Sequence, residues 1–198
     1  MKIKVKKILI FLITILMTIN FTFSEVVQIW KWNSFANAVY ISDGIFITNK
    51  HCDTLFDDFQ VIIKFNDKQK LINIKEVYYF NDRDIVIFVI DKNEIKEFKL
   101  KEEKYLGIAE KFKKVMIDSW WITRIKTLIT SQIEIKDPNT IYMNGAVYQG
   151  MSGSAVYFDK HLAGIVSKGN AYGDIYCEII NEQIINIIKQ IQNEKDKN

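Results

Sequence analysis

The sequence of 198 residues is poor in proline, cysteine and histidine. Its one proline, Pro138, excludes a proline-rich linker, and no internal repeat or low-complexity stretch divides the chain. Two cysteines are too few for a disulfide scaffold, and the two histidines stand in no ligand-spaced cluster with cysteines or carboxylates. These shortages predict one domain, or two very small ones, with a hydrophobic core and with no metal or cofactor.

The first residues differ from the rest of the chain. Four lysines among the first seven residues precede an uncharged run over residues 8–17 that is apolar except for Thr14. This pattern is typical of a signal peptide, and we expect cleavage after Ser24, which leaves residues 25–198 as the folded domain. The apolar run is shorter than the roughly 20 residues that a membrane-spanning helix needs, so an uncleaved anchor is the less favoured alternative.

An excess of basic charge is missing from the expected mature chain. The whole sequence has 27 Lys and Arg against 24 Asp and Glu, and removal of the four leader lysines leaves 23 basic residues. Basic and acidic side chains are mixed, as in the sequence KEEK at residues 101–104, which indicates a solvated surface. We therefore expect no nucleic-acid partner, and no stable membrane association once the leader is removed.

From Asn37 onward, short β-branched and aromatic runs alternate with turn-forming residues, which predicts an antiparallel sandwich or barrel. The expected strands lie at residues 38–41, 45–48, 59–65, 72–80, 85–90, 114–122, 125–135, 141–148, 155–158, 162–167 and 174–177. The charged segment 94–110 lacks clean alternation, so we interpret it as a connector between halves at about 37–93 and 111–178. Isoleucines spaced by three and four residues predict an amphipathic helix over about 179–193.

The sequence GMSGS at residues 150–154 places a serine in a tight, glycine-flanked loop just before an expected strand. Glycine lets the backbone turn so that successive N–H groups point at one spot, as an oxyanion hole requires. A serine hydroxyl also needs a base within hydrogen-bond reach and a third group that orients the base. Ser152 is the candidate nucleophile, and Ser154 more plausibly supports the loop because the glycines centre on Ser152.

Only two histidines can serve as the base. His51 follows the apolar run 45–48 and is far from Ser152 in sequence, whereas His161 lies in an expected hairpin as a solvent-exposed turn residue. The orienting carboxylate has two candidates, Asp82 and Asp84, because both precede the same expected strand and alternate residues share one face.

Several motifs resemble those of trypsin-like serine peptidases of the chymotrypsin clan. Residues 47–52 (ITNKHC) resemble the histidine motif of that family, residues 84–87 (DIVI) its aspartate motif, and residues 150–154 its serine motif, in the same order. The separations of 33 and 68 residues look like those of the compact bacterial secreted members. Residues 163–169 (AGIVSKG) resemble the strand that lines the specificity pocket, and residues 174–176 (DIY) the final strand.

The resemblance covers about residues 38–192 and implies an all-β fold of two six-stranded antiparallel β-barrels with a C-terminal α-helix. It implies a secreted or periplasmic serine endopeptidase that hydrolyses protein or peptide substrates through an acyl-enzyme, without metal or cofactor. In these roles Ser152 attacks the carbonyl carbon, His51 is the general base and Asp84 orients His51. The backbone N–H groups of Gly150 and Ser152 would form the oxyanion hole.

The resemblance also places a substrate pocket. Ala146 corresponds to its floor, and Ser167, Lys168 and Gly169 correspond to a wall. These positions and the residues beside them contain no Asp or Glu, so a substrate Lys or Arg would be buried without a counter-charge. We expect a neutral, small or medium apolar residue on the acyl side of the cleaved bond.

Departures from the family pattern lead to further expectations. Met151 occupies the position at which digestive members carry an aspartate that pairs with a new N-terminus, so we expect activity without N-terminal trimming. The usual disulfide partner of Cys52 is missing, which favours a free buried thiol over a bond to Cys177. The alternative function is a catalytically silent pseudopeptidase that binds peptides or surfaces.

Overall fold

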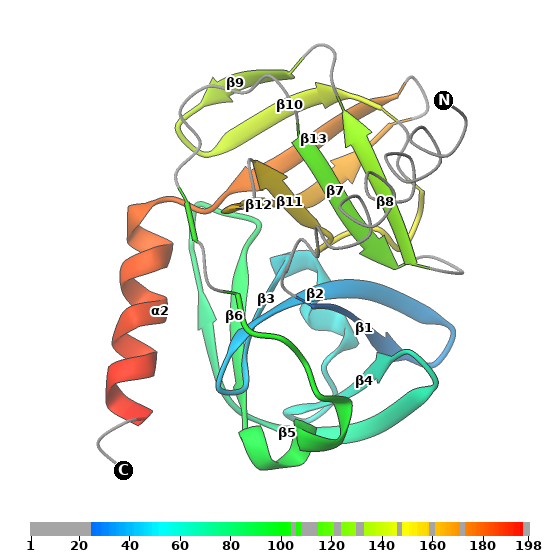
Figure 1. Ribbon diagram of the computed structural model, residues 1–198, viewed down its shortest axis with the longest axis vertical. Coiled ribbons are helices and arrows are strands. Elements are labelled where there is room, and N and C mark those ends of the chain that lie inside the picture. Colours follow the sequence, from blue (N-terminus) through cyan, green and yellow to red (C-terminus); the bar gives the residue numbers. More distant parts are fainter. Residues whose placement is uncertain are drawn as a thin grey trace, which may run out of the picture.

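The computed structural model describes residues 25–103, 106–107, 115–120, 124–129, 133–145, 148–158, 161–170 and 173–195. The expected signal peptide, residues 1–24, and the expected pocket residue Ala146 lie outside the described residues. Two β units are stacked, and one long helix packs along their side (Figure 1).

The N-terminal unit is a closed barrel in the order β1-β2-β3-β6-β5-β4, and every neighbouring pair is antiparallel. Its strands are β1 (Val26–Lys31), β2 (Ser34–Ser42), β3 (Ile45–Thr48), β4 (Gln60–Phe65), β5 (Lys68–Tyr79) and β6 (Val86–Ile90). A short 3-10 helix, Lys50–Leu55, follows β3 and contains His51. The barrel interior is filled by apolar side chains, among which Phe46 and Phe88 stack at 5.0 Å between ring centroids.

The barrel begins earlier than the expected start at Asn37. Strand β1 is absent from the predicted strands, yet it pairs with both β2 and β4 and closes the barrel. Val26, Val27 and Ile29 are fully buried there. Strand alternation is hidden in this segment because consecutive apolar residues are buried on both faces of the strand, one inside the barrel and one against the C-terminal unit.

The C-terminal unit is a seven-stranded antiparallel sheet in the order β8-β7-β11-β12-β13-β10-β9. Its strands are β7 (Val115–Trp120), β8 (Arg124–Ile129), β9 (Ile133–Asp137), β10 (Thr140–Asn144), β11 (Ala155–Phe158), β12 (His161–Gly169) and β13 (Asp174–Ile179). The predicted all-β fold of two β units with a C-terminal helix is thereby confirmed; the first unit is the expected six-stranded barrel, and the second is this seven-stranded sheet. The strand count exceeds the expected six because the predicted run 125–135 contains two strands, β8 and β9.

Helix α2 (Glu182–Lys195) ends the described chain. It begins after the expected residue 179, because Ile179 still pairs with Gly164 in the sheet. The Asn181 side chain accepts a hydrogen bond from the Ile184 N–H at 3.2 Å, which caps the first turn. No helix in the described part of the chain is long and apolar enough to cross a membrane.

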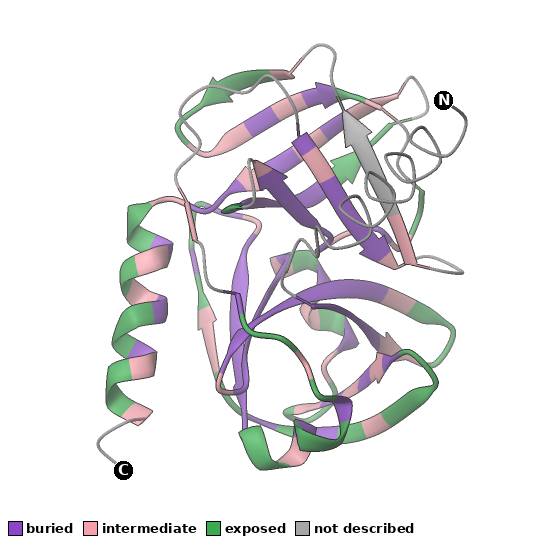
Figure 2. Cartoon of the chain, in the orientation of Figure 1, coloured by how far each residue is buried: buried purple, intermediate pink, exposed green. Residues whose placement is uncertain are grey.

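Three apolar cores organise the molecule. One fills the barrel, one lies within the C-terminal sheet, and the third lies between the two units and under α2. Buried residues accordingly follow the facing strands of both units and one side of the helix (Figure 2). The two units are therefore docked by a continuous apolar interface, which determines the relative position of their loops.

Candidate catalytic site

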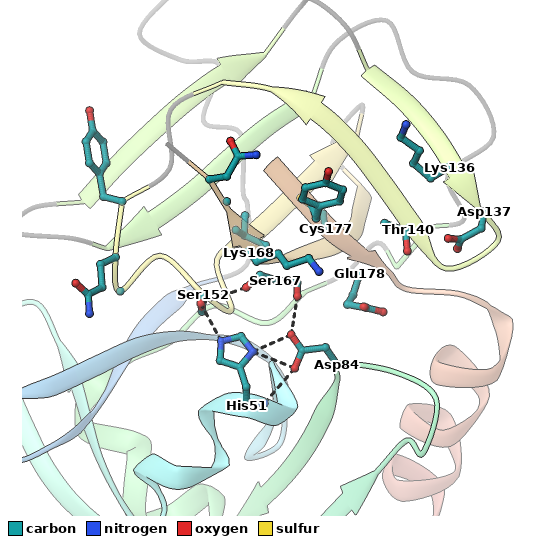
Figure 3. Close-up of a pocket in the computed structure, with 17 residues that line it drawn as sticks. His51, Asp84, Lys136, Asp137, Thr140, Ser152, Ser167, Lys168, Cys177 and Glu178 are labelled. Carbon is teal, nitrogen blue, oxygen red and sulfur yellow. Dashed lines mark hydrogen bonds and ion pairs between the residues drawn. The ribbon is translucent and has the colours of Figure 1, made fainter. Parts of the chain in front are cut away.

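His51, Asp84 and Ser152 come together where the two units meet (Figure 3). The Nδ1 atom of His51 lies 2.8 Å from Oδ2 of Asp84, and its Nε2 atom lies 3.0 Å from Oγ of Ser152. The backbone N–H of His51 also donates to Oδ1 of Asp84 at 3.0 Å. Because an ionised carboxylate only accepts hydrogen bonds, Nδ1 carries a hydrogen, and in the neutral ring Nε2 presents a lone pair to the Ser152 hydroxyl.

Asp84 lies just before β6, and several neighbours hold it in place. The Ser167 hydroxyl donates to Asp84 Oδ2 at 2.6 Å, and the side-chain amide of Asn49 donates to the Asp84 carbonyl at 3.0 Å. Asp82 is exposed and lines a separate hollow. The fold therefore brings Asp84 and not Asp82 to the histidine, and it places Ser167, expected only in a pocket wall, in contact with the carboxylate.

These contacts change the affinity of both groups for protons. The hydrogen bond with Asp84 is the largest cause that raises the pKa of His51 above its ordinary value of 6.5. Burial by itself raises the pKa of Asp84, but hydrogen bonds from His51 and Ser167 outweigh burial and lower it below 3.8. At neutral pH the carboxylate is therefore ionised and stabilises a positive charge on the imidazole ring.

The loop that carries Ser152 depends on two glycines. Gly150 and Gly153 adopt φ values of +91° and +77°, which side chains rarely tolerate. A Cβ atom on Gly153 would lie 1.8 Å from the carbonyl oxygen of Asn37, so only glycine fits there. Among the described residues, the N–H groups of Gly150 and Ser152 have no protein acceptor, as expected of donors that await a ligand oxygen.

Ser154, the other serine of this loop, is fully buried. Its hydroxyl donates to the Met151 carbonyl and is also hydrogen-bonded to the Ser119 hydroxyl, with 2.7 Å between the two Oγ atoms. Met151 is itself buried among apolar side chains. The buried hydroxyl of Ser154 therefore stabilises the loop, and Ser152 is the serine of this loop that contacts His51.

A pocket of about 1140 Å³ opens beside these three residues. Of the expected pocket residues, Ser167, Lys168 and Gly169 line it, and Ala146 falls outside the described residues. The pocket is also lined by two carboxylates that lie outside the expected walls, Asp137 and Glu178. Sequence reasoning missed them because they come from the end of β9 and from β13, whose packing against the pocket depends on tertiary structure.

The remaining candidates form no part of the hydrogen bonds that link Ser152, His51 and Asp84. His161 is exposed at the start of β12. Cys52 and Cys177 are both free and buried, one in the barrel core and the other in the core of the C-terminal sheet. Burial raises the pKa of the Cys177 thiol, so it stays protonated at neutral pH.

No protein-family model and no curated protein matches the sequence. Among solved structures, a Glu endopeptidase is similar with a TM-score of 0.65 at 14% identity, over 87% of this chain and 92% of that one. A human pathogenic astrovirus serine protease is similar with a TM-score of 0.62 at 13% identity, over 80% of this chain and 90% of that one. The scabies mite inactivated protease paralogue S-D1 is similar with a TM-score of 0.68 at 10% identity, over 84% of this chain and 91% of that one. Such low identities show the chymotrypsin-like fold alone, and that fold also occurs in inactivated proteins.

Proposed function

We propose that this protein is a serine endopeptidase with Ser152 as nucleophile, His51 as general base and Asp84 as the residue that orients the base. The observation that carries the proposal is the unbroken series of hydrogen bonds from Ser152 Oγ through the His51 ring to the Asp84 carboxylate. Those three groups stand in the order and at the distances that acyl transfer to serine requires.

In the proposed reaction, Ser152 Oγ attacks the carbonyl carbon of a peptide bond while His51 Nε2 takes the hydroxyl proton. The N–H groups of Gly150 and Ser152 donate to the resulting oxyanion, and the C–N bond breaks as His51 returns the proton to the leaving amine. Water then attacks the acyl carbon while His51 Nε2 takes its proton, and the ester bond to Ser152 Oγ breaks as His51 returns the proton to that oxygen. The carboxylate of Asp84 stabilises the imidazolium during both steps, and no metal or cofactor takes part.

We also propose that the protein is exported by cleavage after Ser24, as in compact bacterial secreted peptidases. The lysine-rich start and the short apolar run of residues 1–24 support this proposal. The mass of the protein recovered outside the cytoplasm tests it: a chain that starts at Glu25 is expected, and retention of the apolar run would contradict it.

One alternative function has an observation in its favour, because inactivated protease paralogues share this fold. A silent relative would bind peptides in the pocket without cleaving them. The two functions differ in the reactivity of Ser152, since only a serine with an effective base reacts quickly with a fluorophosphonate near neutral pH.

The deciding experiment is therefore fluorophosphonate labelling of the purified protein, with the labelled residue located by mass spectrometry. We expect the label on Ser152, and none in the Ser152→Ala variant, whose circular dichroism should match the wild type. Labelling of Ser154 would overturn the assignment of the nucleophile. A folded wild-type protein that neither takes up the label nor cleaves a denatured protein would support the silent alternative.

A further inference from the structure

Asn37, on β2 of the barrel, is fully buried and reaches across to the C-terminal unit. Its side-chain amide donates to the carbonyls of Gly150 at 2.8 Å and Trp120 at 3.0 Å, and its Oδ1 atom accepts from the Trp120 N–H at 2.9 Å. Its backbone N–H donates to the Ser152 carbonyl at 2.7 Å. One residue of the barrel thus holds two carbonyls of the nucleophile loop in the other unit.

The positions of these bonds matter because the oxyanion-hole N–H groups and the carbonyls bound by Asn37 belong to successive peptide groups of the loop. The free N–H groups of Gly150 and Ser152 belong to the peptide groups 149–150 and 151–152. Asn37 binds the oxygens of the groups 150–151 and 152–153, which follow each free N–H. The peptide group 150–151 is held at its other end too, where the Met151 N–H donates to the Tyr148 carbonyl at 3.0 Å.

The loop needs such anchoring because Gly150 has a positive φ and no side chain to restrict its rotation. An oxyanion hole works only when its donors already point at the oxygen before the reaction begins. A small rotation of the group 150–151 would turn the neighbouring Gly150 N–H away from the site. The side chain of Asn37 opposes that rotation by a bond made across the interface between the units.

We propose that Asn37 is a positioning residue for the oxyanion hole and couples its geometry to the docking of the two units. This inference rests on the proposed peptidase function and assigns no direct contact between Asn37 and substrate. An amide suits the position because both hydrogens of its Nδ2 group and one lone pair of Oδ1 are engaged, so its burial leaves no donor unsatisfied.

The kinetic test compares Asn37→Ala and Asn37→Asp with the wild-type protein on a fluorogenic peptide that the wild type cleaves. Asn37→Asp keeps the side-chain volume and the acceptor for Trp120, but it loses the donor to Gly150. We expect kcat to fall about 10²-fold in both variants, while KM changes less than about threefold. Ile63→Val, a change in the barrel core away from the loop, is the control for a general loss of stability.

A second measurement is independent of catalysis. Amide hydrogen exchange of residues 148–154, followed by mass spectrometry, should be at least about tenfold faster in both Asn37 variants than in wild type and in Ile63→Val. Unchanged exchange in this segment, or a loss of kcat no larger than in Ile63→Val, would overturn the role of Asn37. If the wild type neither cleaves peptides nor labels with fluorophosphonate, the peptidase proposal fails, and the exchange result alone decides whether Asn37 anchors the loop.

Discussion

The two β units differ in closure and in what they contribute to the site. The N-terminal barrel is closed and carries His51 and Asp84 on neighbouring loops, whereas the C-terminal sheet carries Ser152 and Ser167. The bond between His51 and Asp84 therefore forms within one unit, and the bond between His51 and Ser152 forms only when both units are docked. Orientation of the base is therefore mainly a property of the barrel, to which Ser167 of the other unit adds one hydrogen bond, while reactivity of the serine is a property of the interface.

The interface between the units combines apolar packing with a few buried polar links. The apolar core shared by the two units and α2 lies at this interface. Arg83, from the barrel, donates to Glu178 of β13 at 2.9 Å and also bonds to the Ile179 carbonyl. Arg124 of β8 joins Asp118 to Glu25, which precedes β1. Changes in one unit and changes at the interface should consequently have different effects on activity and stability.

The largest expected effect comes from the barrel itself. Asp84→Asn should lower kcat by about 10⁴-fold, because the amide leaves His51 in the wrong tautomer and without its counter-charge. Asp82→Asn is the matched control, since Asp82 is exposed and makes no contact with His51. Steady-state kinetics on one peptide substrate would measure both. Equal losses in the two variants would mean that Asp84 does not orient the base.

The next effect concerns the interface. Glu178→Gln should lower the free energy of unfolding by about 3 kcal/mol, because it leaves the buried Arg83 guanidinium without a counter-charge. Asp43→Asn removes the solvent-exposed ion pair with Lys92, which lies within the N-terminal unit. This change should lower the free energy of unfolding by less than about 1 kcal/mol. Urea unfolding of each variant gives the comparison, and similar costs would show that the Arg83–Glu178 pair does not stabilise the docked units.

A smaller effect should appear in the dependence of activity and stability on pH. Catalysis needs neutral His51, so kcat/KM should rise with pH through the folded-state pKa of His51, at a midpoint above 6.5. The ion pair between His51 and Asp84 contributes to folding stability with the opposite dependence on pH. This contribution is fully present below the pKa of His51 in the unfolded chain and is lost as pH rises through the pKa in the folded protein. At low pH it is lost again as pH falls through the lowered pKa of Asp84.

Titration of the His51 ring by NMR in His161→Gln, which retains one histidine, measures this pKa directly. Removal of the carboxylate charge by Asp84→Asn should lower the pKa of His51. A pKa of His51 that is the same with and without Asp84→Asn would contradict the electrostatic pairing within the barrel.

The smallest effect should come from reduction. The two cysteines lie in the cores of different units and are unbonded. A reducing agent should therefore leave Tm unchanged within about 1 °C, because no covalent link between the units is removed. A clear decrease in Tm with dithiothreitol would show that Cys52 and Cys177 cross-link the units in solution.

Much of the fold could be predicted because strand patterns are local. Short β-branched and aromatic runs bounded by turn-forming residues revealed β3, β6 and β11, and isoleucine spacing revealed α2. Strand β1 was missed because Gln28 interrupts its short apolar run, and only its pairing with β2 and β4 defines it as a strand. The division of residues 125–135 into β8 and β9 was missed because it depends on which strands pair across the sheet.

The sequence by itself determined which side chains could perform the proposed chemistry, because few histidines and glycine-flanked serines were available to choose from. The choices of Asp84 over Asp82 and of Ser152 over Ser154 were decided in the structure by the contacts that each side chain makes. Asn37, Asn49 and the bond from Ser167 to Asp84 had no local signal. Their partners lie more than 30 residues away along the chain. The fold of the barrel brings Asn49 to Asp84, whereas only the docking of the two units brings Asn37 to Gly150 and Ser167 to Asp84.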